Sequence, residues 1–161
     1  MTPLNTLAVL LVAFVAVFLE THHRGLRNLI GAQIDLLPAL VVCTSLKSGL
    51  GTVGLVAVTG GLWFDSLSAN PLGVSILPLF LVGAAVHHVR DLILREQRRA
   101  QLLLGFAGSA AAPLLTVIVL LALGREPLLD GWSLWRWLVM AVGGALLTPV
   151  FVTVFDMIQG A

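Results

Sequence analysis

The chain has 161 residues, of which 58% are hydrophobic and 11% are charged, and its formal net charge is +1. Soluble domains carry about 25% charged residues, so these proportions exclude a water-soluble globular fold and indicate an integral membrane protein. The length suits one membrane domain over residues 1–161. The near-neutral charge argues against a nucleic-acid partner, and the single cysteine, Cys43, excludes an intramolecular disulfide.

The first predicted element is the apolar stretch Leu4–Leu19. No basic region precedes it and no small-residue cleavage site follows it, so we expect a retained membrane span and not a signal peptide. The polar segment Glu20–Asp35 comes next and carries two arginines and two histidines.

The apolar run Leu36–Phe64 is too long for one untilted helix, because about 20 residues are enough to cross about 30 Å. Lys47, Ser48 and Gly49 interrupt this run. The interruption predicts a short helix that ends near Leu46, followed by a longer helix from Leu50 to Phe64.

Three further helices are expected, over Pro71–Leu94, Leu102–Leu123 and Leu134–Ile158. Pro113 and Pro149 should bend the last two of them. The predicted fold class is therefore all-α, a polytopic membrane bundle of six transmembrane helices, of which the second is too short to span cleanly.

The positive-inside rule predicts the topology. The most basic segment carries Arg90, Arg95, Arg98 and Arg99 and should be a cytoplasmic basic patch, which places both termini in the cytoplasm. A five-span alternative treats residues 36–64 as one tilted helix and fits the count of basic residues slightly better. Six spans are preferred, because a lysine at the centre of a lone span costs about 3 kcal/mol.

Small residues that let helix backbones approach one another recur on single faces of three predicted helices. We interpret them as helix-packing positions within the bundle, and a docking face for another protein's helix is the alternative. Four tryptophans are interpreted as interfacial anchors at the outer face. The packing positions are Gly54, Ala57 and Gly61, then Gly105, Gly108 and Ala112, then Ala141, Gly144 and Thr148, and the anchors are Trp63, Trp132, Trp135 and Trp137.

No group of residues predicts catalysis, a metal site or a cofactor. Neighbouring helical residues point about 100° apart, so neither His22-His23 nor His87-His88 chelates a metal well alone. Asp65 and Asp156 are expected at opposite faces of the membrane and cannot act as paired carboxylates. The predicted basic patch can bind anionic lipid headgroups or a cytoplasmic partner, although a role in setting the topology is the simpler interpretation.

The stretch GLWFDSLSANPLG, from Gly61 to Gly73, interrupts this apolar pattern with polar residues. Asn70 is a good N-cap, and Pro71 suits the first position of the following helix. Serine hydroxyls can satisfy backbone groups at the turn, and Asp65 would face the positive end of the next helix dipole. The residues therefore predict a tight, self-capped hairpin at the outer interface.

The same stretch resembles the central motif of the MreD family, the rod shape-determining membrane proteins of bacteria. The likeness rests on Asp65-x-Leu67-Ser68-x-x-Pro71-Leu72-Gly73 between two apolar helices. The chain length, the Asp35-Leu36-Leu37-Pro38 start of the short helix, the basic segment and the late proline Pro149 also fit. The long polar segment after the first span and the absence of tyrosine depart from the family pattern.

The resemblance implies a non-catalytic scaffold of the cell-elongation machinery in the bacterial cytoplasmic membrane. Its direct partner would be MreC, and through MreC it would connect to a class B penicillin-binding protein, RodA and MreB. The resemblance also implies a fold similar to the substrate-binding subunits of energy-coupling-factor transporters, with membrane lipids around it.

Two other functions are alternatives to the scaffold. A vitamin-like small-molecule binding subunit of a transporter is the alternative, but the first span lacks the Ala-x-x-x-Ala docking pattern of such subunits. An intramembrane hydrolase lacks a nucleophile–base pair. On the scaffold hypothesis, the residues expected to shape a partner-binding rim are Asp65, Ser66, Ser68, Asn70, Pro71 and Gly73.

Overall fold

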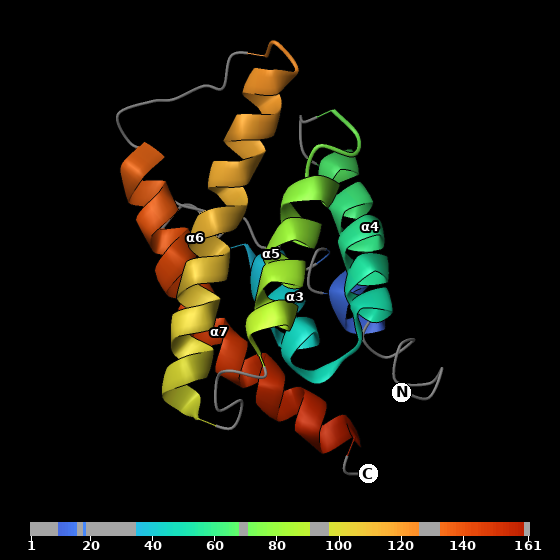
Figure 1. Ribbon diagram of the computed structural model, residues 1–161, viewed down its shortest axis with the longest axis vertical. Coiled ribbons are helices and arrows are strands. Elements are labelled where there is room, and N and C mark those ends of the chain that lie inside the picture. The colour runs from blue at the N-terminus through green and yellow to red at the C-terminus, as the bar shows by residue number, and fades with distance from the viewer. Residues whose placement is uncertain are drawn as a thin grey trace.

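The computed structural model describes residues 10–15, 18, 35–67, 71–90, 97–125 and 133–159, and the regular elements among them are all helices (Figure 1). Three are long and apolar enough to cross a membrane, namely α4, α6 and most of α7. This architecture fits a helical membrane bundle. The helices are α3 (Leu36–Lys47), α4 (Leu50–Leu67), α5 (Ile76–Val89), α6 (Arg98–Ala122) and α7 (Ser133–Gln159).

The predicted break between the second and third helices is confirmed. Ser48 adopts an extended conformation (φ −120°, ψ 170°) directly after α3, and α4 begins two residues later. The chain reverses there, so that Leu37 near the start of α3 packs against Gly60 near the end of α4. This reversal excludes the single tilted helix that the five-span alternative requires.

α3 is the central helix of the bundle. It has 12 residues, and all ten from Leu37 to Leu46 are buried. It contacts α4, α5, α6 and α7, which surround it in Figure 1. At 1.5 Å per residue its length is about 18 Å, well short of a full membrane crossing. A helix that is apolar on every side is expected in such a core position.

The start of α5 differs from the prediction. The sequence places Pro71 at the first helical position, but residues 71–75 form a turn and the helix begins at Ile76, after Ser75. Gly73 has a positive φ of 94°, which a right-handed helix does not accommodate. Pro78 then lies in the first turn of α5, where its missing N–H breaks no intrahelical hydrogen bond.

α6 and α7 cross through their small residues. A Cβ added at Gly105 would lie 2.7 Å from the Gly144 carbonyl oxygen, and one added at Gly144 would overlap the Ser109 side chain. Gly108 packs in the same way against Val42 of α3. These three predicted packing positions therefore lie where α6 meets its neighbours.

Of the three packing positions predicted on α4, two are tightly packed and one is not. Ala57 is fully buried, and a Cβ at Gly61 would lie 3.1 Å from the Ile76 backbone. Gly54 has only an ordinary contact with the Phe80 ring, at 3.7 Å. Two tight positions were not predicted: Gly60, and Gly83 of α5, whose added Cβ would meet Val53, Val41 and Ser45.

Trp137, one of the predicted interfacial anchors, contacts α6. Its side chain is half-buried, and its indole N–H donates to the Ala110 carbonyl oxygen at 2.9 Å. Ala110 lies about midway along α6, one turn before Pro113. Pro113 has no N–H to donate to the Ser109 carbonyl oxygen, so Trp137 binds the residue next to one that lacks its helical hydrogen bond. Trp135 is exposed, and Trp132 lies outside the described residues.

Candidate functional site

The hairpin between α4 and α5 is built around Asp65. This residue lies in the last turn of α4 and is 1% exposed. Its Oδ2 accepts hydrogen bonds from the backbone N–H groups of Gly73 (2.8 Å) and Ser75 (3.1 Å). Its Oδ1 accepts one from the Ser75 hydroxyl at 2.5 Å. Both carboxylate oxygens are thus engaged by the segment that leads into α5.

The geometry of this segment explains why the stretch carries an aspartate and a glycine. Gly73 takes a positive φ, which turns its own N–H and that of Ser75 toward one point. Alternate backbone N–H groups in a turn form a concave anion site, and here the chain's own carboxylate fills it. The turn is closed further by the Val74 N–H, which donates to the Pro71 carbonyl oxygen at 3.3 Å. The hairpin is therefore closed from within by Asp65, whereas the helix that follows begins at Ile76 and not at the predicted Pro71.

The other predicted rim residues have different positions. Ser66 is exposed, and its hydroxyl donates to the Trp63 carbonyl oxygen at 2.8 Å, which caps the end of α4. Pro71 is half-buried at the start of the turn. Ser68 and Asn70 lie outside the described residues. Sequence reasoning missed Ser75, because its only signal is a hydroxyl ten residues after the aspartate.

Two leucines flank the turn at the surface. Leu67 is 57% exposed at the end of α4, and Leu72 is 70% exposed within the turn. Asp65 is buried, so its carboxylate supports the hairpin from inside, whereas Leu67 and Leu72 lie on the described outer surface together with Ser66. A partner that docks on this hairpin would therefore meet apolar side chains and not the Asp65 charge.

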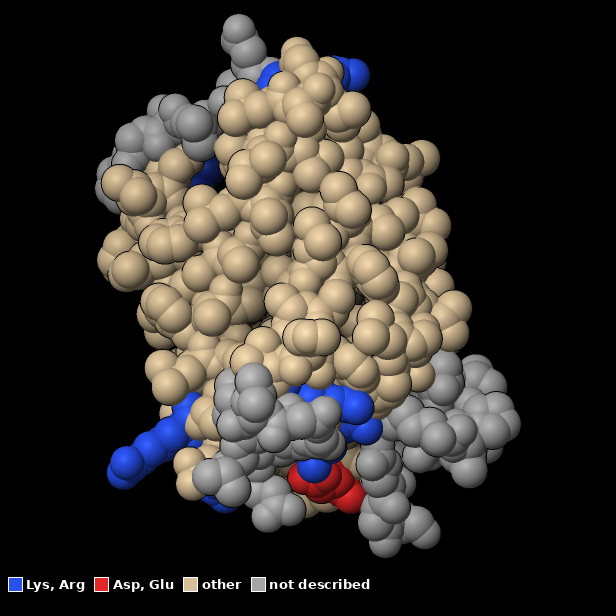
Figure 2. All heavy atoms as spheres, viewed as in Figure 1, with Lys and Arg blue, Asp and Glu red and all other residues tan. Residues whose placement is uncertain are grey.

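The opposite end of the bundle carries a basic cluster, which we call the basic end and define as Lys47, Arg90, Arg98 and Arg99. Figure 2 shows the charged atoms of this face gathered toward its ends, with a broad uncharged middle. The ends of α3, α5 and α7 and the start of α6 meet here in Figure 1. This grouping agrees with the end that the sequence predicts to be cytoplasmic.

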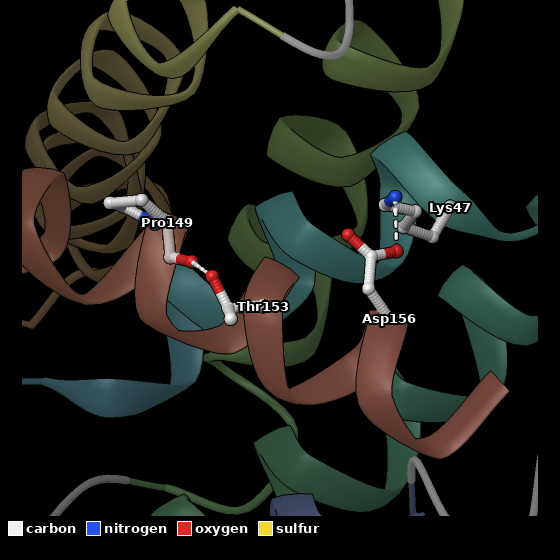
Figure 3. Close-up of polar contacts among 4 residues, drawn as sticks. All are labelled: Lys47, Pro149, Thr153 and Asp156. Atoms are coloured by element: carbon white, nitrogen blue, oxygen red, sulfur yellow. Dashed lines mark hydrogen bonds and ion pairs between the residues drawn. The ribbon is translucent and has the colours of Figure 1, made fainter. Parts of the chain in front are cut away.

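Two contacts of the basic end hold α3 in place. Lys47 forms an ion pair with Asp156 of α7, with Nζ and Oδ1 2.5 Å apart (Figure 3). Arg90 donates from one guanidinium nitrogen to the Ser48 carbonyl oxygen at 2.6 Å and to the Ser45 carbonyl oxygen at 3.3 Å. A cation at the C-terminal end of a helix is favourable, because the helix dipole is negative there. Arg95 lies outside the described residues.

The path of α7 brings Asp156 to Lys47. α7 changes direction along its length in Figure 1, and Pro149 lies in its second half. The Thr153 hydroxyl donates to the Pro149 carbonyl oxygen at 2.8 Å, one turn before Asp156 (Figure 3). The last turns of α7 therefore reach across the end of α3.

The histidine pairs that the sequence singles out are only partly described. His87 and His88 lie in the last turn of α5, and His22 and His23 lie outside the described residues. Within the described ranges, no group of three or more histidine, cysteine, aspartate or glutamate side chains is placed to hold a metal ion. What the site offers chemically is a rigid, apolar-faced hairpin at one end and a cationic surface at the other.

Comparison of the chain with protein-family models, curated proteins and solved structures found no match.

Proposed function

We propose that this chain is a non-catalytic membrane scaffold of the MreD type, which binds MreC and helps regulate side-wall peptidoglycan synthesis and cell shape. The observation that carries the proposal is the capped hairpin. The resembling motif has Asp65 and Gly73 at its two ends, and the buried hydrogen bonds join those two ends into one rigid turn. The motif thus corresponds to a turn whose backbone is held by internal hydrogen bonds, and such a turn can offer a fixed surface to a partner.

The docking surface in this proposal is the apolar face of the hairpin. Leu67 and Leu72 project from a turn whose backbone is fixed by Asp65, so little conformational freedom is lost when a partner binds them. The contacting segment of MreC would be its transmembrane or juxtamembrane helix, which offers apolar side chains at helical spacing. Connections to a class B penicillin-binding protein, RodA and MreB would pass through MreC.

The test is co-purification of MreC with the chain in mild detergent, using the double variant Leu67→Ala/Leu72→Ala. Loss of two exposed leucine contacts should lower recovery of MreC at least tenfold, which corresponds to about 1.4 kcal/mol. The matched control is Leu121→Ala/Leu123→Ala at the end of α6, because these leucines are 57% and 60% exposed. The control should recover MreC as the wild type does.

Two results would count against the proposal in different ways. If wild-type protein recovers no MreC, the family relationship fails. If MreC is recovered equally with both double variants, the chain binds MreC through another surface and the hairpin has only a structural role. In cells, the Leu67→Ala/Leu72→Ala variant should fail to restore rod shape to a strain that lacks the protein.

A further inference from the structure

The cations of the basic end fall into two groups. Lys47 is paired with Asp156, and Arg90 is bound to the last carbonyl oxygens of α3. Arg98 and Arg99 are exposed, and the described part of the chain gives neither of them a hydrogen bond or an ion pair. The structure therefore accounts for the first two charges within the bundle and leaves the other two directed outward.

The local backbone adds to the positive potential at Arg98 and Arg99. They occupy the first turn of α6, where the helix dipole is positive, and this turn contains no acidic residue. The preceding residue, Gln97, makes no side-chain capping hydrogen bond. Two guanidinium groups beside a positive helix end repel it, so an external anion would be stabilised by both arginines and the dipole together.

An apolar strip begins one turn further along the same helix. Leu102 is 36% exposed, Leu103 is 70% exposed and Phe106 is 39% exposed, and all three follow the arginines within two turns. The strip continues along α6 with Leu114 and Ile118, which are more than half exposed. A cationic group at the membrane boundary above a lengthwise apolar strip matches the shape of a phospholipid, with a phosphate at one end and acyl chains along the helix.

We propose that the first two turns of α6 bind an acidic phospholipid, with Arg98 and Arg99 on its headgroup and Leu103 and Phe106 against its acyl chains. The site is independent of the hairpin and of any protein partner. Charge complementarity selects the headgroup, because a zwitterionic lipid carries no net negative charge to offset the two arginines. The apolar strip selects a membrane lipid over a free anion of the same charge.

The experiment titrates detergent-purified protein with phosphatidylglycerol or with phosphatidylcholine of the same chains and measures bound lipid by native mass spectrometry. The wild type should bind phosphatidylglycerol more tightly than phosphatidylcholine. The variant Arg98→Gln/Arg99→Gln should bind phosphatidylglycerol about 30-fold more weakly, which corresponds to about 1 kcal/mol for each arginine. Its binding of phosphatidylcholine should stay at the wild-type level.

The matched control is Arg125→Gln/Arg136→Gln. Both of these arginines are exposed, and they lie beyond the end of α6 and near the start of α7, at the opposite end of the bundle. This variant removes the same charge and should bind phosphatidylglycerol as the wild type does. If both double variants lose binding equally, net charge alone explains the effect and the proposed site is wrong.

Two measurements on wild-type protein need no variant. Raising the salt concentration should weaken phosphatidylglycerol binding, because exposed charges are screened, and salt-independent binding would contradict a headgroup contact at Arg98 and Arg99. Glycerol 3-phosphate, which supplies the phosphate without acyl chains, should not displace the lipid at equal concentration. Full displacement by glycerol 3-phosphate would show an anion site without lipid selectivity and would overturn the proposal.

Discussion

Two of the helix pairs in this protein, α6–α7 and α4–α5, are held together in different ways. In α6–α7 the helices approach so closely at Gly105 and Gly144 that neither position has room for a Cβ, and the buried Ser109 hydroxyl between them has no hydrogen-bond partner. In α4–α5 a buried carboxylate, Asp65, ties the end of one helix to the start of the next. The α6–α7 contact depends on close packing, and the α4–α5 contact depends on three hydrogen bonds to Asp65. The two contacts should therefore be sensitive to different substitutions.

The largest effect is expected from Gly144→Leu, which places a large side chain where α6 and α7 approach most closely. The new side chain would overlap Ser109 and lie against the Gly105 carbonyl oxygen, so the two helices must separate. We expect a loss of more than about 3 kcal/mol and little folded protein, measured as monodisperse yield in detergent. Gly51→Leu is the control, since nothing lies within 4 Å of a Cβ there. Normal yield for Gly144→Leu would show that α6 and α7 do not depend on this crossing.

The next largest effect is expected from Asp65→Asn, which weakens the hydrogen bonding between the end of α4 and the start of α5. An asparagine has one acceptor oxygen for three donors, so at least one buried donor loses its partner. We expect about 2–3 kcal/mol of destabilisation, measured by thermal unfolding in detergent. A double-mutant cycle with Ser75→Ala should show coupling, because both residues belong to the same contact. Additive effects would mean that the hydroxyl and the carboxylate act separately.

This expectation changes what Asp65→Asn can reveal about a partner. A mild effect would ordinarily indicate a local cap, and a severe effect would indicate a contact with another protein. The three internal hydrogen bonds make a large effect on stability compatible with a purely local role. Partner binding is therefore better tested at Leu67 and Leu72, whose replacement leaves the Asp65 hydrogen bonds intact.

The variant Gly61→Ala tests whether the close packing of α4 against α5 also contributes to stability. The added methyl would lie 3.0–3.1 Å from the Ile76 side chain and backbone, which the adjacent Asp65–Ser75 contacts hold in place. We expect about 1 kcal/mol of destabilisation in the same unfolding assay. Gly51→Ala should instead stabilise α4 by about 0.5–1 kcal/mol, because alanine has the higher helix propensity. If Gly61→Ala and Gly51→Ala change the unfolding temperature equally, close packing at Gly61 contributes little. The Asp65 hydrogen bonds would then be the main contact that holds α4 to α5.

The smallest effect is expected from Asp156→Asn, which removes the exposed ion pair with Lys47. Its effect is to be compared with the loss of the buried hydrogen bonds of Asp65. Asp156 is 54% exposed and Lys47 27% exposed, so water and salt weaken their attraction. We expect a loss of about 0.2–1 kcal/mol at low salt that fades as salt is added. A loss as large as that of Asp65→Asn would mean that burial does not set the strength of these contacts.

The main features of the fold could be predicted from sequence where the signal is local. Lys47, Ser48 and Gly49 interrupt an apolar run, and a charge with a flexible glycine is enough to end one helix before the next. The start of α5 could not be predicted in this way. Asn70-Pro71 looks like a helix start by its immediate neighbours, whereas the actual turn depends on Asp65, which is eight residues from Gly73 along the chain.

The candidate site shows the same division. Asp65 and Gly73 were identified because their residue types are unusual in an apolar chain, but the burial of the carboxylate depends on how α4 and α5 pack. The contact of Trp137 could not be predicted for a similar reason. Tryptophan prefers membrane interfaces on average, and only the contact with α6 reveals that its N–H binds the Ala110 carbonyl oxygen.

The central position of α3 has a consequence for the order in which the protein assembles. α3 is made before α4, α5, α6 and α7, and the last of these described helices, α7, is among its contacts. It therefore precedes in synthesis the helix α7 that it contacts. Its composition suits exposure to lipid before that contact forms, because the Thr44 and Ser45 hydroxyls donate to carbonyl oxygens of α3 itself, those of Leu40 and Val41. The core helix can thus reside in lipid before its protein neighbours arrive, and it is enclosed only when α7 packs against it.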